Sequence, residues 1–309
     1  MEALVKNRKS NNEIMKVSII TINYNNKAGL ERTIQSVLSQ TVYDKIEYIV
    51  VDGASTDGSA EVLKQHESLL SYAISEPDKG IYNAMNKGVV HATGDYCLFL
   101  NSGDFLRADD IIERCMPKLG TEDLVMGKVE TWPTGRIGYD DISLPFTMMD
   151  FFQYGPVPHM ACFIRRKLFD KNLYDESLRI VADWKFFMNA IVFDGCTCKL
   201  IEDVVSYLEE GGISANRYEC DKERAKVLKE TLPEAIYLDY NRFANGKHYG
   251  ASNYDSFFSD LKNYNERCAK LVYRLSLSLV AMNVIMALQK FEVRRKISMR
   301  SLHGYAWYV

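Results

Sequence analysis

Short apolar runs alternate with longer amphipathic stretches between residues 16 and 101. Four runs rich in β-branched and aromatic residues predict strands, at 16–25, 46–52, 72–78 and 94–101. Three stretches carry apolar residues at the spacing of a helix face, at 29–40, 59–70 and 79–93. Strands that alternate with helices of this length predict a parallel, doubly wound α/β sheet.

The alternation loosens after residue 105. Further strands are predicted within 122–130, 160–169 and 199–210, and a helix is predicted over 183–195. From residue 216 onward the pattern is mostly helical and richer in charged residues and Tyr. We therefore predict three regions: a flexible leader at 1–15, an α/β domain at 16–215 and a helical C-terminal region at 216–309.

Composition excludes several classes of protein. The chain has 309 residues, 47% hydrophobic and 26% charged, which is typical of a soluble protein with a sizeable core. Its net charge of −3 gives no general attraction to nucleic acid. No apolar signal segment precedes the first predicted strand, and the seven Cys include no CxxC pair. We therefore expect a cytoplasmic protein with reduced thiols.

Polar clusters follow the predicted strands, where ligands bind in open α/β sheets. The clusters are Asn23–Asn25, Asp52 with Ser55 and Asp57, and Asn101–Asp104. Asp78 and Lys79 precede a predicted helix start, where backbone N–H groups favour an anion. Carboxylates beside such a helix start predict a phosphate ligand bridged by a divalent cation such as magnesium.

Two common nucleotide-binding motifs are missing from the sequence. There is no GxxxxGK[ST] loop, which argues against a P-loop NTPase, and no GxGxxG after the first strand, which argues against a dinucleotide dehydrogenase. The first strand instead ends in "NYNN", where Tyr24 offers a ring for stacking. Asp52 is suited to accept a proton from a base N–H or from a ribose hydroxyl.

In order and spacing, "VSIITINYNN", "IEYIVVDGASTDGS", "SEPDKGIYNAMNKG" and "GDYCLFLNSGD" resemble the N-terminal half of glycosyltransferase family 2. The resemblance continues more loosely to "GGIS" at 211–214. It implies the GT-A fold, a mostly parallel sheet flanked by helices, here with a C-terminal helical extension. It also implies an inverting transfer from a nucleotide sugar.

The resemblance further implies a donor site at the strand ends. Tyr24 and Asp52 would contact the nucleoside, with Asp52 on the base, and Asp78 and Lys79 would lie beside the nucleotide. The predicted donor-binding residues are Thr21, Asn23, Tyr24, Asp52, Asp78, Lys79, Asn101, Ser102 and Gly103.

"NSGD" stands where the family has a DxD-type metal motif. Asn101 and Gly103 replace acids, so Asp104 remains as the predicted carboxylate ligand for Mg²⁺ or Mn²⁺. His159 precedes an apolar strand in "GPVPHMACF", and it is predicted to contact the metal or the diphosphate. Asp183, in "ADW", is predicted as the general base that accepts the proton of the acceptor hydroxyl.

Each of these residues also has a structural interpretation. Asp183 would make a good N-cap for the helix that follows it, and Asp78 would suit the same role in the earlier helix. Asp52 and Asp104 are suited to turns, and His159 to a buried structural role. Arg165 and Arg166 are expected on a solvated face.

The stretch "LVYRLSLSLVAMNVIMALQKF", at 271–291, is mainly apolar with basic flanks. Its uninterrupted apolar part, 275–288, is shorter than the roughly 20 residues that a spanning helix needs. Two interpretations remain open. The stretch forms an interfacial helix, consistent with peripheral contact at the inner face of the cell membrane, or it packs on the α/β domain or on a second subunit of a homo-oligomer.

These observations predict an inverting glycosyltransferase of surface polysaccharide synthesis. Its donor would be a nucleotide sugar, favoured as a UDP-sugar, and its acceptor a hydroxyl of a glycan or lipid-linked glycan. One alternative is a catalytically weak nucleotide-sugar-binding scaffold of the same fold, which the loss of acids in "NSGD" favours. The other is a nucleotidyltransferase, although "NYNNKAGLER" lacks the Gly-rich basic loop usual after the first strand of such enzymes.

Overall fold

A central mixed sheet organises the chain in the computed structural model, which describes residues 15–140, 142–153 and 155–244. In this part of the chain the sheet has nine strands in the order β3-β2-β1-β4-β8-β6-β9-β5, with β7 paired to β6. The strands are β1 (Val17–Asn23), β2 (Ile46–Asp52), β3 (Tyr72–Ser75), β4 (Tyr96–Phe99), β5 (Phe105–Leu106), β6 (Leu124–Trp132), β7 (Arg136–Gly138), β8 (Cys162–Arg165) and β9 (Cys198–Glu209). The predicted α/β class, with a mostly parallel sheet, is confirmed.

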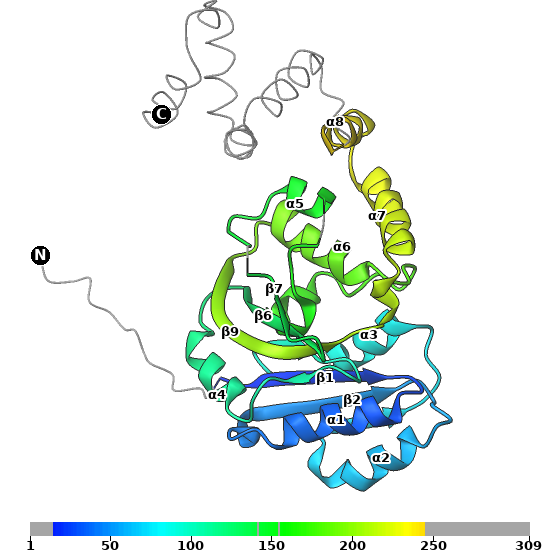
Figure 1. Cartoon of the computed structure of the whole chain (residues 1–309), viewed down its shortest axis with the longest axis vertical. Coiled ribbons are helices and arrows are strands. Elements are labelled where there is room, and N and C mark those ends of the chain that lie inside the picture. Colours follow the sequence, from blue (N-terminus) through cyan, green and yellow to red (C-terminus); the bar gives the residue numbers. More distant parts are fainter. Residues whose placement is uncertain (1–14, 141, 154, 245–309) are drawn as a thin grey trace, which may run out of the picture. The chain divides into compact units, whose positions relative to one another are not determined.

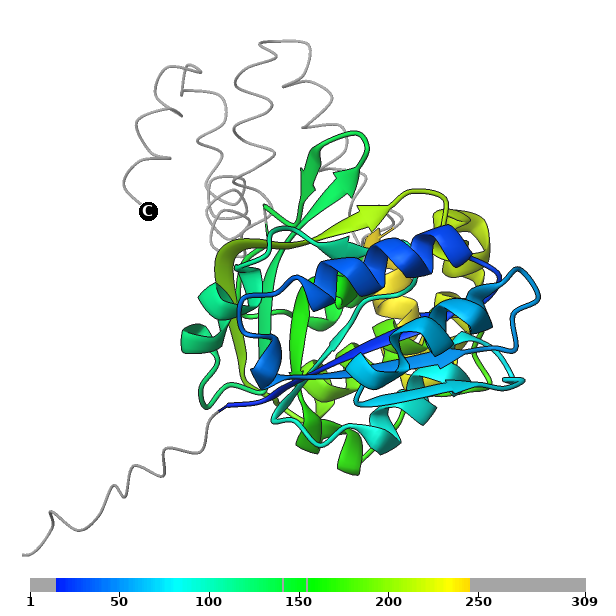
Figure 2. The same cartoon turned by 90° about the horizontal axis from the view of Figure 1, so that it is seen from below.

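Helices cover both faces of the sheet (Figures 1 and 2). They are α1 (Lys27–Leu38), α2 (Ser59–His66), α3 (Ile81–His91), α4 (Ile111–Cys115), α5 (Met148–Gln153), α6 (Ala182–Met188), α7 (Arg217–Thr231) and α8 (Glu234–Ala244). In Figure 1, α1 and α2 lie on one side of β1 and β2, and α3 and α6 lie on the other.

The alternation of side chains along β1 explains why both faces need covering. Ile20 and Ile22 pack into a core cluster with α3 and α6, whereas Val17 and Ile19 pack into a second cluster with α1, α2 and α4. Successive side chains of a strand point to opposite faces, so a strand with large apolar residues on both faces must be buried on both. All seven residues of β1 are buried accordingly.

Parallel pairing brings strand ends to one edge of the sheet. Asn23 at the end of β1 is in register with Asp52 at the end of β2, and Asp52 is in register with Ser75 at the end of β3. β4 runs parallel to β1, so the 101–104 segment that follows it reaches the same edge. We call this the carboxyl edge.

The predicted strand within 160–169 departs from the purely parallel arrangement. It forms β8, which is antiparallel to both β4 and β6. Its last residue, Arg165, therefore lies at the edge opposite the carboxyl edge. The hairpin strand β7 and the two-residue β5 are also antiparallel to their partners.

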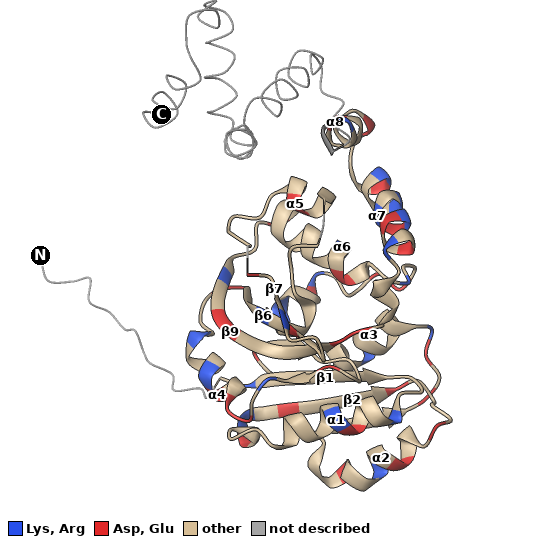
Figure 3. Cartoon of the chain, viewed as in Figure 1, with Lys and Arg blue, Asp and Glu red and all other residues tan. Residues whose placement is uncertain are grey.

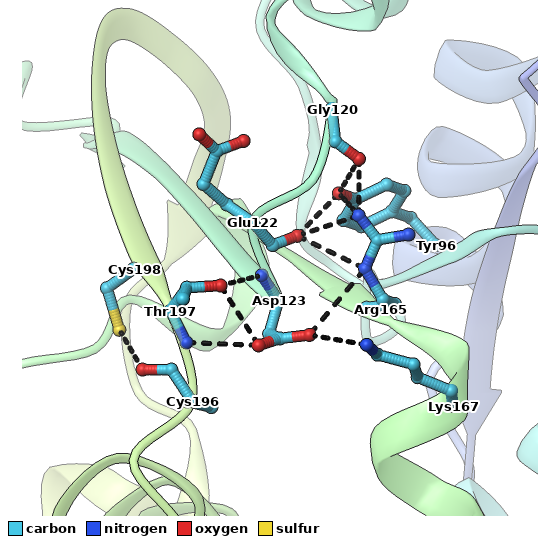
Figure 4. A network of polar contacts seen from close by, with 9 residues as sticks. All are labelled: Tyr96, Gly120, Glu122, Asp123, Arg165, Lys167, Cys196, Thr197 and Cys198. Carbon is cyan, nitrogen blue, oxygen red and sulfur yellow. Dashed lines mark hydrogen bonds and ion pairs between the residues drawn. The ribbon is translucent and has the colours of Figure 1, made fainter. Parts of the chain in front are cut away.

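Arg165 is a structural residue there, and not part of the solvated face that we expected (Figure 4). Its guanidinium donates to Tyr96 Oη across 2.6 Å and to the carbonyl of Glu122 across 3.1 Å. Asp123 accepts from the Thr197 hydroxyl, 2.9 Å away, and pairs with Lys167 at 3.1 Å. This network ties the starts of β4, β6 and β9 to the end of β8.

A compact unit ends at Tyr240. The predicted boundary after residue 215 falls between β9 and α7, inside this unit, because Cys220, Val227 and Leu228 of α7 are buried in its core. The predicted leader, apart from residue 15, and the predicted apolar helix at 271–291 lie outside the described residues. Within the described part of the chain, every helix is too short or too polar to cross a bilayer.

Candidate active site

Asp52 is the centre of a polar cluster at the ends of β1, β2 and β3. Its Oδ1 accepts from Asn23 Nδ2 at 2.7 Å, and its Oδ2 accepts from the Ser75 hydroxyl at 2.5 Å. Ser55 adds its hydroxyl and its backbone N–H. Burial alone would raise the pKa of Asp52, yet these donors hold the pKa below its ordinary value. The carboxylate is thus ionised, fully enclosed and satisfied by four donors.

Tyr24 and Asp78 flank this cluster on its solvent side. Tyr24 has an exposed fraction of 68%, so its ring is open to a ligand. A Cβ at Gly53 would overlap Asp78 Oδ2 and lie 3.1 Å from Tyr24 Cδ2, so both side chains meet over this glycine. Asp78 Oδ1 accepts from the N–H of Gly80, the residue before α3.

Thr21, by contrast, is buried in the sheet and shares a 3.1 Å hydrogen bond with Tyr48 Oη.

The 101–104 turn is docked on α1. Thr33 Oγ1 accepts from the Gly103 N–H at 3.0 Å and donates to the Asp104 carbonyl at 2.7 Å. Asn26 Nδ2 donates to the Ser102 carbonyl at 3.0 Å. Gly103 has φ of +110°, a value that side-chain-bearing residues rarely adopt. A Cβ at position 103 would also overlap Glu209 Oε2, so the space of a side chain there is already filled.

Asp104 is the last residue of this turn, and its side chain is buried. Its Oδ1 accepts the backbone N–H of Glu209 at 3.0 Å, and its exposed fraction is 6%. Burial raises the pKa of Asp104 to about 7, and the N–H of Glu209 and the charge of Arg32 offset burial only in part. The Glu209 carboxylate forms an ion pair with Arg32.

His159 and Asp183 meet on the α3 and α6 side of the sheet. His159 Nε2 lies 2.9 Å from Tyr174 Oη, and His159 Nδ1 lies 3.7 Å from Asp183 Oδ2. Burial lowers the pKa of His159, and the Asp183 charge opposes this only in part, so the imidazole is neutral. Asp183 Oδ1 accepts from Tyr82 Oη at 2.7 Å, and its side chain is 29% exposed.

Asp183 is not the N-cap of its helix. Helix α6 begins at Ala182 with Val181 at the N-cap position, so Asp183 is the second helical residue. An acid in the first turn interacts favourably with the helix dipole, but the carboxylate points to Tyr82 and not to a backbone N–H of the cap. Its second oxygen, Oδ2, lies 3.7 Å from His159 Nδ1, too far for a hydrogen bond, so it can still accept from another proton donor.

The predicted metal ligands are not brought together in a single cluster. Among the described residues, no group of three or more His, Cys, Asp and Glu side chains is arranged to hold a metal ion. Both nitrogens of His159 face other groups, Tyr174 and Asp183. The 101–104 turn nevertheless offers oxygen: Asn101 Oδ1 is buried and accepts no hydrogen bond from the described residues. An amide oxygen and the carboxylate of Asp104, both from one turn, are ligand types that a hard cation takes, with phosphate and water as further ligands.

Sequence reasoning missed several residues that build this site. Tyr82 and Tyr174 occupy apolar positions and are typical of core residues, and only their contacts with Asp183 and His159 distinguish them. Glu209 ends a strand without any motif around it.

A cavity of about 540 Å³ lined by Asp123, Lys167 and Cys196 is separate from the candidate active site, because none of the predicted site residues lines it.

Comparison with known proteins connects this geometry to a family. The model of Glycosyl transferase family 2 matches residues 18–173. A PGL/p-HBAD biosynthesis glycosyltransferase of Mycobacterium bovis is 33% identical over 232 residues, which cover 72% of this chain and 87% of the relative.

Two solved structures share the fold. Staphylococcus aureus TarS 1–349 in complex with UDP-GlcNAc superposes with a TM-score of 0.54 at 19% identity, covering 85% of this chain and 80% of that one. The mannosyltransferase PcManGT of Pyrobaculum calidifontis, in complex with GDP-Man and Mn²⁺, gives 0.52 at 18% identity and covers 87% and 86%.

Proposed function

The chain belongs to glycosyltransferase family 2, and from this premise we propose that it transfers a sugar, with inversion, from a UDP-sugar to a hydroxyl of a glycan or lipid-linked acceptor. The relatives include enzymes of glycolipid and polysaccharide synthesis, which supports a role in building surface polysaccharide. The observation that carries the proposal is the Asp183 carboxylate. It is partly exposed, it is held on one oxygen by Tyr82, and its other oxygen makes a contact of 3.7 Å with His159 Nδ1.

The donor would lie along the carboxyl edge. Tyr24 offers an exposed ring on which a base can stack, next to the Asp52 cluster at the ends of β1 and β2. Asp52 already accepts four hydrogen bonds, so we propose that it acts on the nucleoside by orienting Asn23 and Ser55. Asn23 Oδ1 is buried and receives no hydrogen bond from described residues, which leaves it an acceptor for a base or ribose donor.

A divalent cation, Mg²⁺ or Mn²⁺, would be held at the 101–104 turn by Asn101 and Asp104. When bound, it neutralises charge that develops on the departing diphosphate. Lys79, ahead of α3, is proposed to add a positive charge near the same phosphates. The geometry favours His159 as a neighbour of Asp183 over its predicted role as a metal ligand.

The chemistry itself is a displacement at the sugar C1. The acceptor oxygen forms a bond to C1 as the bond from C1 to the phosphate oxygen breaks, and the nucleoside diphosphate leaves with the electron pair. Asp183 Oδ2 accepts the proton of the acceptor hydroxyl. Tyr82 stays protonated, because burial and then the Asp183 charge raise its pKa far above the ordinary value. It therefore remains a donor that keeps Oδ1 occupied.

Donor cleavage and product stereochemistry test the proposal. The protein is incubated with UDP-sugars and Mn²⁺, with and without a lipid-linked glycan, and the anomer of the product is read by NMR. UDP binding is measured in parallel by calorimetry. We expect release of UDP and a product of inverted configuration.

Other outcomes favour the alternatives. Tight UDP binding without cleavage of any common UDP-sugar would favour the nucleotide-sugar-binding scaffold, for which the glycine at position 103 is the supporting feature. Release of pyrophosphate from a nucleoside triphosphate would favour the nucleotidyltransferase. A retained configuration would rule out direct displacement with Asp183 as base.

A further inference from the structure

The segment just before α6 is held by a carboxylate from a distant helix. Glu223 of α7 accepts from the backbone N–H groups of Arg179 and Ile180, both at 2.7 Å, and of Val181 at 3.0 Å. Successive backbone N–H groups lack local partners at the start of a helix, so a partner must come from elsewhere. Here one side chain, more than forty residues away in sequence, satisfies all three.

The 179–181 backbone is connected to Asp183 through Tyr82. Tyr82 Oη lies within hydrogen-bonding distance of both the Ile180 carbonyl and Asp183 Oδ1, so its single proton is shared between these two acceptors. Glu223 thus fixes the N–H side of the Ile180 backbone while Tyr82 fixes its carbonyl side. The catalytic carboxylate, Tyr82 and the 179–181 backbone form one continuous hydrogen-bonded unit that ends on Glu223.

Helix α7 presents Glu223 rigidly. Val227 and Leu228 bury one face of the helix in the core, and the Arg224 guanidinium lies over the Trp184 ring at 5.7 Å from its centroid. Trp184 is the residue after Asp183, so α7 contacts α6 next to the proposed catalytic residue. The rest of α7 carries Lys, Arg, Asp and Glu in mixed order (Figure 3).

We propose that Glu223 is a positioning residue for sugar transfer. By satisfying the three N–H groups, it makes a cap from Asp183 unnecessary and sets the angle at which the Asp183 carboxylate meets the acceptor hydroxyl. This inference rests on the proposed role of Asp183 as general base. It extends the catalytic machinery into α7, beyond the residues 18–173 that match the family model.

The test compares Glu223→Gln and Glu223→Asp with Glu230→Gln, an exposed position on the same helix. Gln keeps the size of Glu but replaces one of its two accepting oxygens with an NH₂ group, so at least one of the three N–H groups loses its acceptor, whereas Asp keeps the charge. Turnover is expressed per UDP-binding site, counted by calorimetry, so that misfolded protein does not contribute. We expect kcat to fall at least tenfold in Glu223→Gln, with UDP affinity within twofold of wild type, partial recovery in Glu223→Asp and no change in Glu230→Gln.

A second comparison separates positioning from general stabilisation. In an Asp183→Asn background, Glu223→Gln should lower the residual donor cleavage no further, because the residue acts through Asp183. An unchanged kcat in Glu223→Gln, or an equal further loss in the Asp183→Asn background, would overturn the inference while leaving the proposed function standing. If the wild-type protein shows no turnover at all, the proposed function fails and the inference fails with it.

Discussion

Tyr82 Oη donates a 2.7 Å hydrogen bond to Asp183 Oδ1 and thereby joins α3 to α6. The two residues are separated by 101 positions in sequence. The tyrosine is buried in the core while the carboxylate remains partly exposed, so the pair connects the rigid interior of the sheet to a group that a substrate can reach.

Asp183→Asn should abolish transfer while leaving the donor site intact. Asparagine keeps the shape and can still accept from Tyr82, but it cannot take the proton of the acceptor. General base catalysis contributes roughly 10²- to 10⁴-fold, so kcat should fall by about that factor. Calorimetry should give a UDP affinity within twofold of wild type. The control is Asp170→Asn, a change at an exposed ion pair with Arg166. A large loss of UDP affinity would instead indicate a structural role.

Tyr82→Phe should weaken catalysis and stability together. The ring remains to fill the core, but Asp183 Oδ1 and the carbonyl of Ile180 lose their shared donor. A buried acceptor left without its partner costs about 1–3 kcal/mol, which chemical denaturation can measure. We expect kcat to fall by about tenfold, on the order of 1.4 kcal/mol in the barrier. Tyr43→Phe removes a hydroxyl from the Leu69 carbonyl and should leave kcat unchanged.

Asp104→Asn should remove the effect of metal on donor binding. Asparagine can still accept the Glu209 N–H, so the turn should persist, but the ligand charge is lost. With Mn²⁺ present, UDP should bind wild type more tightly than it does after chelation with EDTA, and the variant should show no such difference. Asp110→Asn, at an exposed carboxylate, serves as control. An equal response to Mn²⁺ in the variant would remove Asp104 from the metal site.

The lowered pKa of Glu47 predicts how the free energy of unfolding depends on pH. Burial would raise the pKa of Glu47, but hydrogen bonds from Ser18 and Thr93 and the charge of Lys16 lower it from 4.5 to about 2. The folded state therefore holds this proton more weakly than the unfolded state does. Its contribution is fully present above pH 4.5 and is lost as pH falls from there toward 2.

Glu47→Gln should accordingly lower the free energy of unfolding at pH 7 by up to about 3 kcal/mol. The difference from wild type should shrink as pH falls below 4.5, as measured by urea unfolding across pH. Glu67→Gln, at an exposed glutamate, should show no such dependence. If the free energies of unfolding of Glu47→Gln and wild type differ by the same amount down to pH 2.5, the hydrogen bonds of Glu47 stabilise the fold and its negative charge does not.

The regular part of the fold was predictable because its hydrophobic pattern is strong. The strand predicted at 46–52 coincides with β2, and the helix predicted at 79–93 contains α3, Ile81–His91. The direction of β8 was not predictable, because a short strand with three buried residues has the same hydrophobic pattern in either orientation. The two-residue strand β5 was also missed, since it is too short to show an alternation of apolar and polar residues.

The candidate site was predictable only where it coincides with strand ends. Asn23 and Asp52 meet because both end parallel strands, which sequence pattern can anticipate. The contacts of His159 with Tyr174 and of Glu223 with Ile180 depend on how loops and helices pack. Glu223 is one of many charged residues on α7, and no local signal distinguishes it from its neighbours.

The backbone at Gly103 constrains which residues can occupy this position. An acid at that position would require the turn to abandon its left-handed φ and the Glu209 carboxylate to move aside. Because Glu209 Oε2 ends a flexible side chain that can move aside, the left-handed backbone is the stronger constraint, and a side chain at position 103 would strain the turn even after Glu209 has moved.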